Sequence, residues 1–380
     1  MIKVEKIIPG GQALATGEDG KKIFFWNALP GEDVVSYQVT KHKSHYLEAI
    51  ATSINNPSPF RVEPKDTCFL STSPWQIIDY SSELQLKAAL VQEIFREHHI
   101  DLETPAVITD NQPYYYRNKM EYALYWDNIT NQIELAFHAR GSHRKVPIKS
   151  SSLENPAIFH AATNIIDELN VKKEAARKYQ SLLLRCNQQG EVSGGLFENG
   201  QPHPTFHNLT DQILGQNYSY SPNGFFQINL PVYEMALQTI KPFITTDEVL
   251  DLYAGVGTIG LSVAREHHLT LVECNQSAFS ELQKNSKNAR AVLAKSEEVL
   301  DFIQSTQTVI LDPPRAGCDT KLIERLLSIL PRRIIYLSCN PATQARDVKA
   351  LLAKYHLEKN VAFNFFPRTP HIENLIVLSL

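Results

Sequence analysis

The sequence predicts an α/β protein whose C-terminal part is a doubly wound, Rossmann-like sheet, preceded by a small OB-like β-barrel and a mixed α+β central region. Three observations predict this class. From about residue 246, apolar strands alternate with helical segments, as in parallel sheets. The first 56 residues hold short strands separated by glycine-containing turns, as in small barrels. The stretch between mixes helical and strand-like periods. We expect three domains, over 1–56, 57–225 and 226–380.

The first domain is expected to be built from strands alone. The turn Gly17-Glu18-Asp19-Gly20 separates two of them, and the linker Asn55–Pro59 ends the domain. The five strands are expected over 4–8, 12–15, 22–26, 33–40 and 45–52.

The central domain is expected to begin with a helix over 80–98, because its apolar residues recur at helical spacing. Ser81 or Ser82 is a candidate N-cap, and packing of this helix on the C-terminal domain is left open. Further elements are expected as strands over 114–126 and 134–138, a helix over 156–168, and a hairpin around 180–187 and 194–198.

The C-terminal domain alternates strands and helices. Strands are expected over 248–253, 269–273, 291–295, 308–311, 333–338, 361–366 and 374–380. Helices are expected over 258–267, 276–289, 297–303, 320–330 and 341–354.

Composition excludes several classes of protein. The chain of 380 residues is 43% hydrophobic and 21% charged, which is typical of globular proteins and excludes disordered and fibrous ones. No apolar run approaches the ~18 residues of a membrane span, and the first residues lack the apolar core of a signal peptide. We therefore expect a cytoplasmic protein without membrane contact, with a monomer as the default state.

The formal net charge of −4 argues against nucleic-acid binding. However, the segment 138–149 carries four basic residues, two histidines and no acid, so we expect a local positive charge that faces RNA.

A glycine-containing segment follows the strand over 248–253. Gly255 and Gly257 let a ligand approach the backbone, and the helix that follows offers free N–H groups. Glu273 ends the next strand, where a carboxylate accepts hydrogen bonds from ribose hydroxyls. Tight packing alone would also explain the glycines. The pattern predicts an adenosine-containing cofactor and fits NAD as well as S-adenosylmethionine.

Two further strand ends carry polar residues. Asp312 is followed by two prolines, which stiffen the backbone and would hold its carboxylate over the crevice. Cys339 precedes Asn340 and Pro341, which predict an N-cap and the first residue of a helix. A helix N-terminus stabilises a thiolate, so Cys339 is a candidate nucleophile. The other core cysteines, Cys186, Cys274 and Cys318, are expected to be inert.

Two remaining candidates come from loops. Glu373 precedes the final strand and is either a base at the same sheet edge or a surface carboxylate. Gln227 can both donate and accept hydrogen bonds, so it is suited to a polar ligand. The neighbouring Phe225 and Phe226 are expected in the core.

Several motifs, in this order, resemble the RNA uracil-C5-methyltransferase family. They are FFQIN (225–229), DLYAGVGTIGL (251–261), DPPRAG (312–317), SCNPAT (338–343) and TPHIE (369–373). The first 56 residues are similar to the RNA-binding TRAM domain of the ribosomal-RNA members. YRNKMEY (116–122) and FHARGSHRKVPI (137–148) also resemble the family.

The resemblance implies a role for six residues. Cys339 would be the nucleophile and Glu373 the general base. The S-adenosylmethionine contacts would come from Gln227, Tyr253, Glu273 and Asp312.

Many members of this family also hold an iron–sulfur cluster on four cysteines. The matching stretch here, 66–76, contains only Cys68, and serines stand at 150–152. One ligand cannot hold the cluster, so we predict neither an iron–sulfur cluster nor a metal, and expect polar and apolar packing in its place.

The function that these features predict is transfer of a methyl group from S-adenosylmethionine to C5 of a uridine in RNA. The barrel favours 23S ribosomal RNA, with transfer RNA as the alternative. Uracil C5 is a weak nucleophile until a thiolate adds at C6, and a base must then remove the C5 proton. Three rivals stay open: an amino-methyltransferase acting on a base nitrogen, an NAD-dependent oxidoreductase, and a non-catalytic RNA-binding protein.

Overall fold

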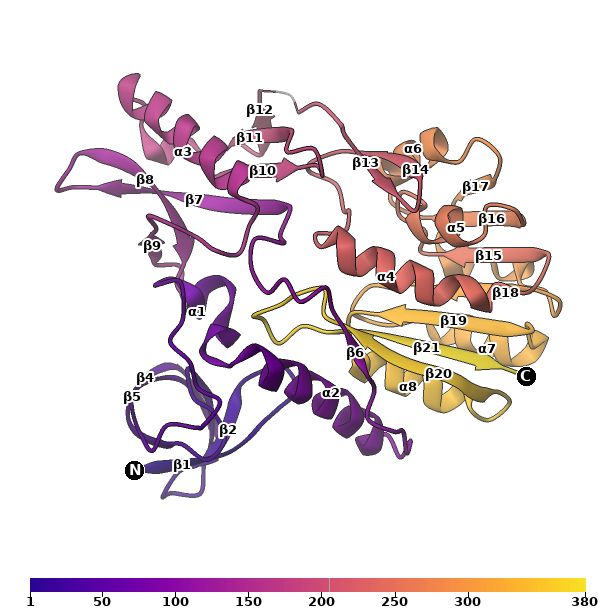
Figure 1. Ribbon diagram of the computed structural model, residues 1–380, viewed down its shortest axis with the longest axis horizontal. Helices are drawn as coiled ribbons and strands as arrows, with labels where there is room; N and C mark the ends of the chain where they lie inside the picture. The colour runs from indigo at the N-terminus through magenta and orange to yellow at the C-terminus, as the bar shows by residue number, and fades with distance from the viewer. Residues whose placement is uncertain (205) are drawn as a thin grey trace.

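The computed structural model describes residues 1–204 and 206–380 of the chain. Its strands form a closed barrel, a six-stranded antiparallel sheet, a two-stranded hairpin and an eight-stranded mixed sheet (Figure 1). In Figure 1 the barrel lies at the lower left and the eight-stranded sheet at the right, and helix α2 (Tyr80–Glu97) runs between them. No helix in the described parts of the chain is both long and apolar enough to cross a membrane.

The barrel contains the five expected strands. Its strand order is β1-β2-β3-β5-β4. Alternate residues point inward, and small Ala13 and Ala49 leave room for the buried ring of Phe25. Trp75 packs in the same core, and its indole N–H donates to the carbonyl of Gly11 at 3.0 Å. The strands are β1 (Ile2–Ile7), β2 (Ala13–Thr16), β3 (Lys22–Trp26), β4 (Asp33–His42) and β5 (Tyr46–Asn55).

The central sheet has the order β12-β11-β10-β7-β8-β9, and helix α3 packs on it. Leu182 and Leu184 on β10 lie in one core with Ile158 and Ala162 of α3. The hairpin β13–β14 that follows was not among the expected elements. The bounds are β7 (Lys119–Asp127), β8 (Gln132–His138), β9 (Lys145–Pro147), α3 (Pro156–Val171), β10 (Ser181–Cys186), β11 (Val192–Glu198), β12 (Gln201–His203), β13 (Leu209–Ile213) and β14 (Gln216–Tyr220).

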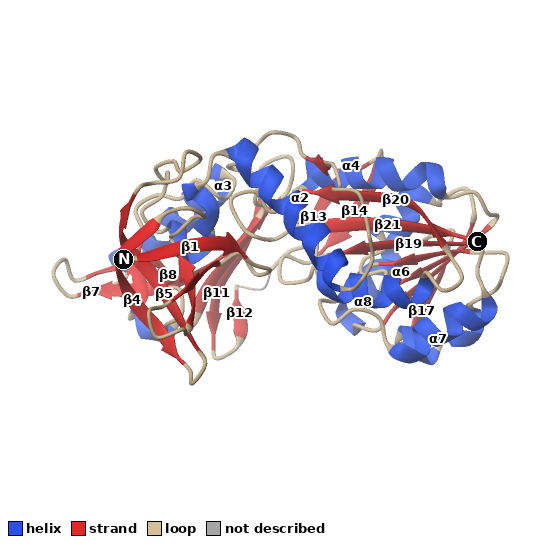
Figure 2. Ribbon diagram, turned by 90° about the horizontal axis from the view of Figure 1, so that it is seen from below, coloured by secondary structure: helices blue, strands red, loops and turns tan. Residues whose placement is uncertain are grey.

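The C-terminal sheet has the order β17-β16-β15-β18-β19-β21-β20-β6, with helices on both faces (Figure 2). Helices α4, α5 and α6 cover one face, and α7, α8 and α2 share a core with the other. The bounds are β6 (Val107–Ile108), α4 (Leu230–Ile240), β15 (Glu248–Leu252), α5 (Thr258–Val263), β16 (His268–Glu273), α6 (Gln276–Asn285), β17 (Arg290–Leu293), β18 (Thr308–Leu311), α7 (Thr320–Ile329), β19 (Arg333–Ser338), α8 (Pro341–Leu351), β20 (His356–Phe363) and β21 (Glu373–Ser379).

Three expectations about these elements were wrong in detail. The sheet is not wholly parallel, because β21 runs antiparallel to both β19 and β20. The loop 364–372 between β20 and β21 is too short for a helical crossover of a dozen or more residues. The segment 297–303 forms two 3₁₀ turns instead of a helix. The N-cap of α2 is Asp79, whose carboxylate accepts from the Ser82 N–H at 3.0 Å.

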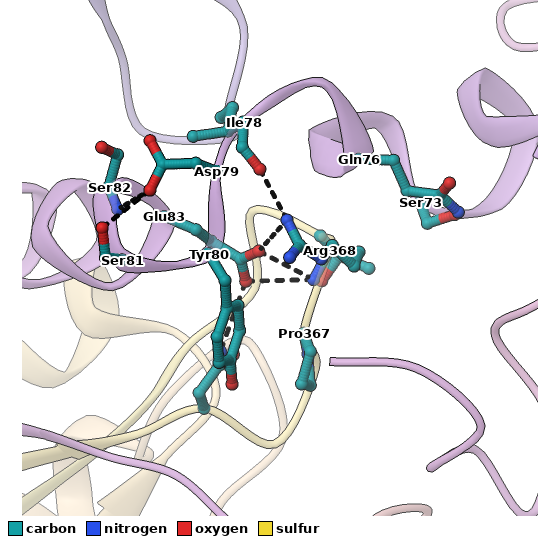
Figure 3. Close-up of polar contacts among 12 residues, drawn as sticks. Ser73, Gln76, Ile78, Asp79, Tyr80, Ser81, Ser82, Glu83, Pro367 and Arg368 are labelled. Atoms are coloured by element: carbon teal, nitrogen blue, oxygen red, sulfur yellow. Dashed lines mark hydrogen bonds and ion pairs between the residues drawn. The ribbon is translucent and has the colours of Figure 1, made fainter. Parts of the chain in front are cut away.

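Buried polar side chains form a hydrogen-bond network over 66–76 and 150–152. In many members of the family that the sequence resembles, cysteines in these segments hold the iron–sulfur cluster. The Asp66 carboxylate accepts from the Ser152 hydroxyl at 2.7 Å and from the Gln76 amide at 2.8 Å. Gln76 also donates to the Ser73 hydroxyl, and its oxygen accepts from the backbone N–H of Asp66. Figure 3 shows Ser73 and Gln76 side by side. Among the described residues, no group of three or more His, Cys, Asp or Glu could hold a metal ion.

Replacing Asp66 by alanine is expected to lower the free energy of unfolding by about 2–4 kcal/mol, because buried donors of Ser152 and Gln76 lose their acceptor. Urea denaturation measures the loss. Asp101→Ala, at an exposed position after α2, is the matched control and should change the value by less than about 0.5 kcal/mol. Equal losses in the two variants would contradict a stabilising role for the network.

Candidate active site

A cavity of about 1310 Å³ lies where strands β15, β16, β18 and β19 reach their carboxyl ends. This is the edge at which open α/β sheets bind ligands. Its volume exceeds the ~300–1,000 Å³ of ordinary small-molecule pockets, so it has room for more than one ligand group. All six residues singled out from the sequence line it, namely Gln227, Tyr253, Glu273, Asp312, Cys339 and Glu373.

One wall of the cavity is the glycine-containing loop between β15 and α5. The Gly255 N–H donates to one oxygen of the Glu273 carboxylate at 2.8 Å, and the Asn275 N–H donates to the other at 2.6 Å. Gly257 has a φ of +91°, and a Cβ there would meet Leu261 and Leu282 at less than 3 Å. The loop is therefore held in one conformation by Glu273 and by packing that only glycine permits.

The same loop contains a backbone outlier. Tyr253 has a φ of +66°, a left-handed conformation that is uncommon outside glycine and found at ligand sites. Tyr253 lies at the end of β15, so this turn aims its ring at the cavity.

The opposite wall joins the loops after β18 and β19. The Asn340 amide donates to the carbonyl of Arg315 at 2.8 Å, and its oxygen accepts from the Ala342 N–H at 3.2 Å. The expected cap at Asn340, with Pro341 in the first turn of α8, is confirmed. The cap fixes Cys339 against the loop that begins at Asp312.

Cys339 and Glu373 meet at the end of one ladder. Ser338 of β19 pairs with Asn374 of the antiparallel strand β21. Cys339 directly follows the end of β19, and Glu373 is the first residue of β21, so both lie at the end of this ladder. Both residues line the cavity, and the Glu373 carboxyl lies near enough to raise the pKa of the Cys339 thiol.

The electrostatics of this pair differ from the sequence expectation. Burial raises the pKa of the Cys339 thiol to about 11, and the carboxyls of Glu373 and Asp312 add to the rise. Burial also raises the pKa of Asp312 to about 7, and it raises the pKa of Glu373 well above its usual range. The expected stabilisation of a thiolate by the helix N-terminus is therefore outweighed in the free protein by desolvation and two nearby carboxyls.

Alkylation of Cys339 by iodoacetamide is expected to speed up about tenfold per pH unit between about pH 7 and pH 9, because a thiol below its pKa gains thiolate as the pH rises. Mass spectrometry of the peptide that contains Cys339 measures the rate. A rate that levels off below pH 8 would show that the thiol has an ordinary or lowered pKa.

The two phenylalanines of the loop before α4 are placed differently. Phe226 is buried and stacks on Tyr220 with ring centroids 3.8 Å apart, as expected for a core residue. Phe225 is 73% exposed and lines the cavity, so its expected core position was wrong. Neighbouring residues of an extended loop point in opposite directions, and both rings cannot enter one core. Asn118 holds this loop by donating to the carbonyl of Gln227 at 3.0 Å.

Other residues that line the cavity were not selected as candidates from the sequence. The guanidinium Nη2 of Arg315 lies 3.2 Å from the ring Nδ1 of His371. The Phe366 ring packs edge-on against His371 with centroids 5.8 Å apart. Cys274, expected to be inert core, is exposed and lines the cavity beside Glu273. Cys318 is buried and also lines the cavity, whereas Cys186 is buried outside it. Only the long-range contact between loops brings these side chains together.

The basic segment 138–149 lies against the barrel. The Arg140 guanidinium stands 4.2 Å from the centroid of the Trp26 ring on β3. His138, His143, Arg144 and Lys149 are exposed. The local positive charge therefore sits next to the barrel and faces solvent.

Comparison with known proteins finds a family model that matches the C-terminal part. Residues 280–380 match the model of the tRNA (Uracil-5-)-methyltransferase family. The chain is 29% identical to an uncharacterized RNA methyltransferase of Lactiplantibacillus plantarum. The match covers 95% of this chain and 93% of that protein. Over its full length it is 27% identical to an uncharacterized RNA methyltransferase of Enterococcus faecalis, of which it covers 97%.

A solved structure shares the fold over the whole chain. The tRNA (uracil-54, C5)-methyltransferase of Pyrococcus abyssi, in complex with S-adenosyl-L-homocysteine, superposes with a TM-score of 0.78 at 24% identity. The match covers 100% of both chains. The barrel, the central sheet and the mixed sheet thus occur together in another protein.

Proposed function

We propose that the chain is an S-adenosylmethionine-dependent RNA (uracil-C5)-methyltransferase, because residues 280–380 match the tRNA (Uracil-5-)-methyltransferase family and an RNA methyltransferase is similar over 95% of the chain. Its proposed reaction is methylation of C5 of one uridine in ribosomal RNA, with Cys339 as nucleophile and Glu373 as general base. The observation that supports this assignment is that Cys339, which follows β19, and Glu373, which begins the neighbouring strand β21, line one cavity.

The proposed reaction uses the two residues in sequence. After loss of its proton to water, the Cys339 sulfur bonds to C6 of the uracil, and the electrons of the C5=C6 bond move towards O4 as an enolate. When bound, S-adenosylmethionine would supply an electrophilic methyl group; C5 would take it as the methyl–sulfur bond breaks, and S-adenosylhomocysteine would leave. Burial raises the pKa of Glu373, so this carboxyl must first release its own proton to water. As a carboxylate it then takes the C5 proton, and the electron pair restores C5=C6 and expels the Cys339 thiolate.

The residues proposed to hold the methyl donor fit an adenosine-containing group. A Cβ on Gly255 would meet no atom within 4 Å, so the backbone there leaves open space. Glu273 holds each of its oxygens on one backbone N–H and keeps further acceptor capacity for ribose hydroxyls. Asp312, Tyr253 and Gln227 line the same cavity and complete the proposed contacts.

We further propose that the target uridine leaves its stack to enter the cavity, because neither Cys339 nor Glu373 could reach a stacked base. The barrel over 1–56 would act as a TRAM-like RNA-binding domain together with the basic segment 138–149, the central domain would span 57–225, and the catalytic domain 226–380. The enzyme would work as a cytoplasmic monomer.

Transfer RNA is the alternative substrate, and the similarity to the Pyrococcus abyssi enzyme supports it. Deleting the protein in its host and mapping 5-methyluridine in both RNAs by nucleoside mass spectrometry decides between them. Loss of one 5-methyluridine from large-subunit ribosomal RNA is the expected result. Loss from transfer RNA alone would establish the alternative, and no loss from either RNA would contradict the proposed function.

A further inference from the structure

A charged cluster lies buried outside the cavity, between helix α2 and the loop 364–372. Glu83 and Lys87 are fully buried and form an ion pair of 2.9 Å one turn apart on α2. Arg368, also buried, reaches Glu83 at 3.5 Å. Such helical pairs usually lie in solvent, and burying charges costs solvation that their attraction often fails to restore. A gain in stability is therefore a weak explanation for this cluster.

The partners of the pair are concentrated in a few residues of the loop. The Lys87 ammonium donates to the side-chain oxygen of Asn364 at 2.6 Å and to the carbonyl of Phe366 at 3.1 Å. The Glu83 carboxylate accepts from the backbone N–H of Arg368 at 3.0 Å. Figure 3 shows the Arg368 guanidinium between the carboxylate of Glu83 and the carbonyl of Ile78. The guanidinium donates to the Ile78 carbonyl at 2.6 Å.

Two further residues, Trp75 before helix α2 and Tyr116 after strand β6, hold the same loop. The Tyr116 hydroxyl donates to the carbonyl of Pro367 at 3.0 Å, and the backbone N–H of Trp75 donates to the carbonyl of Arg368 at 3.0 Å. Arg368 itself has an unfavourable φ of +64°. Three successive carbonyls, from Phe366 to Arg368, thus accept from α2 and its neighbouring segments, which impose the loop conformation.

The loop carries one side of the active site. Phe366 and His371 line the cavity, and Glu373 begins β21 directly after the loop. We propose that Glu83 and Lys87, with Arg368, are positioning residues that hold the loop 364–372 so that Glu373 reaches the C5 proton of the adduct. This inference rests on the proposed function of Glu373.

Lys87→Met tests the proposal, because it deletes both bonds to the loop while leaving Glu83 paired with Arg368. We expect turnover to fall by about 10- to 100-fold, since small misplacement of a catalytic group has effects of this size. Affinity for S-adenosylmethionine should stay within about twofold, because Lys87 does not line the cavity. The signature is accumulation of a denaturant-resistant protein–RNA adduct carrying labelled methyl, measured with total RNA from cells that lack the protein.

The control for Lys87→Met is Lys349→Met on α8, which removes a similar bond from a lysine to the carbonyl of His98, away from the loop. It should leave turnover and adduct level unchanged. Tyr116→Phe, which deletes only the bond to Pro367, is the second variant in case Lys87→Met does not fold, and the same adduct should accumulate. Turnover within about twofold of wild type, or a fall in turnover without adduct, would overturn the proposal. Glu373→Gln in the same assay separates the two claims: if it traps no adduct, the proposed base is wrong, and if it alone traps one, only the positioning role fails.

Discussion

Cys339→Ala is expected to abolish methylation of RNA, with a loss of at least about 10⁴-fold in turnover, because removal of a nucleophile leaves only binding and positioning to promote the reaction. Wild-type protein should form a denaturant-resistant complex with RNA that contains 5-fluorouridine, since fluorine at C5 cannot leave as a proton. Cys339→Ala should form none. Gel electrophoresis under denaturing conditions measures the complex.

Cys186→Ala is the matched control for this prediction, because Cys186 is buried in the central core and lies outside the cavity. It should form the complex as wild type does. If wild-type protein methylates RNA without any such complex, Cys339 is not the nucleophile.

Glu373→Gln is expected to slow turnover by about 10²- to 10⁴-fold, the usual contribution of a general base. The adduct should still form, because the Glu373 carboxyl raises the pKa of Cys339 and its removal favours the thiolate. The methylated adduct should therefore accumulate on ordinary uridine-containing RNA, because the C5 proton is no longer removed. Adduct yield and release of methylated RNA, followed over time, measure the two steps separately.

Glu358→Gln provides the comparison for Glu373→Gln. Glu358 lies on β20 and pairs with Arg333 at 2.8 Å at the protein surface. Its replacement should leave both steps unchanged. Unaltered turnover in Glu373→Gln would show that Glu373 is not the general base.

The features that the sequence predicted well depend on neighbouring residues. Asn is favoured at the N-cap and Pro at the first position of a helix, so the position of Cys339 at a helix start could be predicted from Asn340 and Pro341. Strands β18 and β19 coincide with their expected bounds, because short apolar runs between helices have few other interpretations.

The features that escaped prediction depend on contacts between distant residues. The reversed direction of β21 follows from the short loop before it and from pairing with β19. The raised pKa of Cys339 depends first on its burial and then on Glu373 and Asp312, which the fold brings to the same cavity. Glu83 and Lys87 have the spacing of an ordinary surface pair, and only their burial against loop 364–372 reveals another role.

The central claim is methylation of uracil C5, and one measurement tests it most directly. The purified protein is incubated with ribosomal and transfer RNA from cells that lack it, together with S-adenosylmethionine deuterated in the methyl group, and the nucleosides are analysed by mass spectrometry. The account predicts 5-methyluridine with a deuterated methyl group and no hydrogen left at C5. A methyl group on a base nitrogen, or no transfer to either RNA, would contradict it.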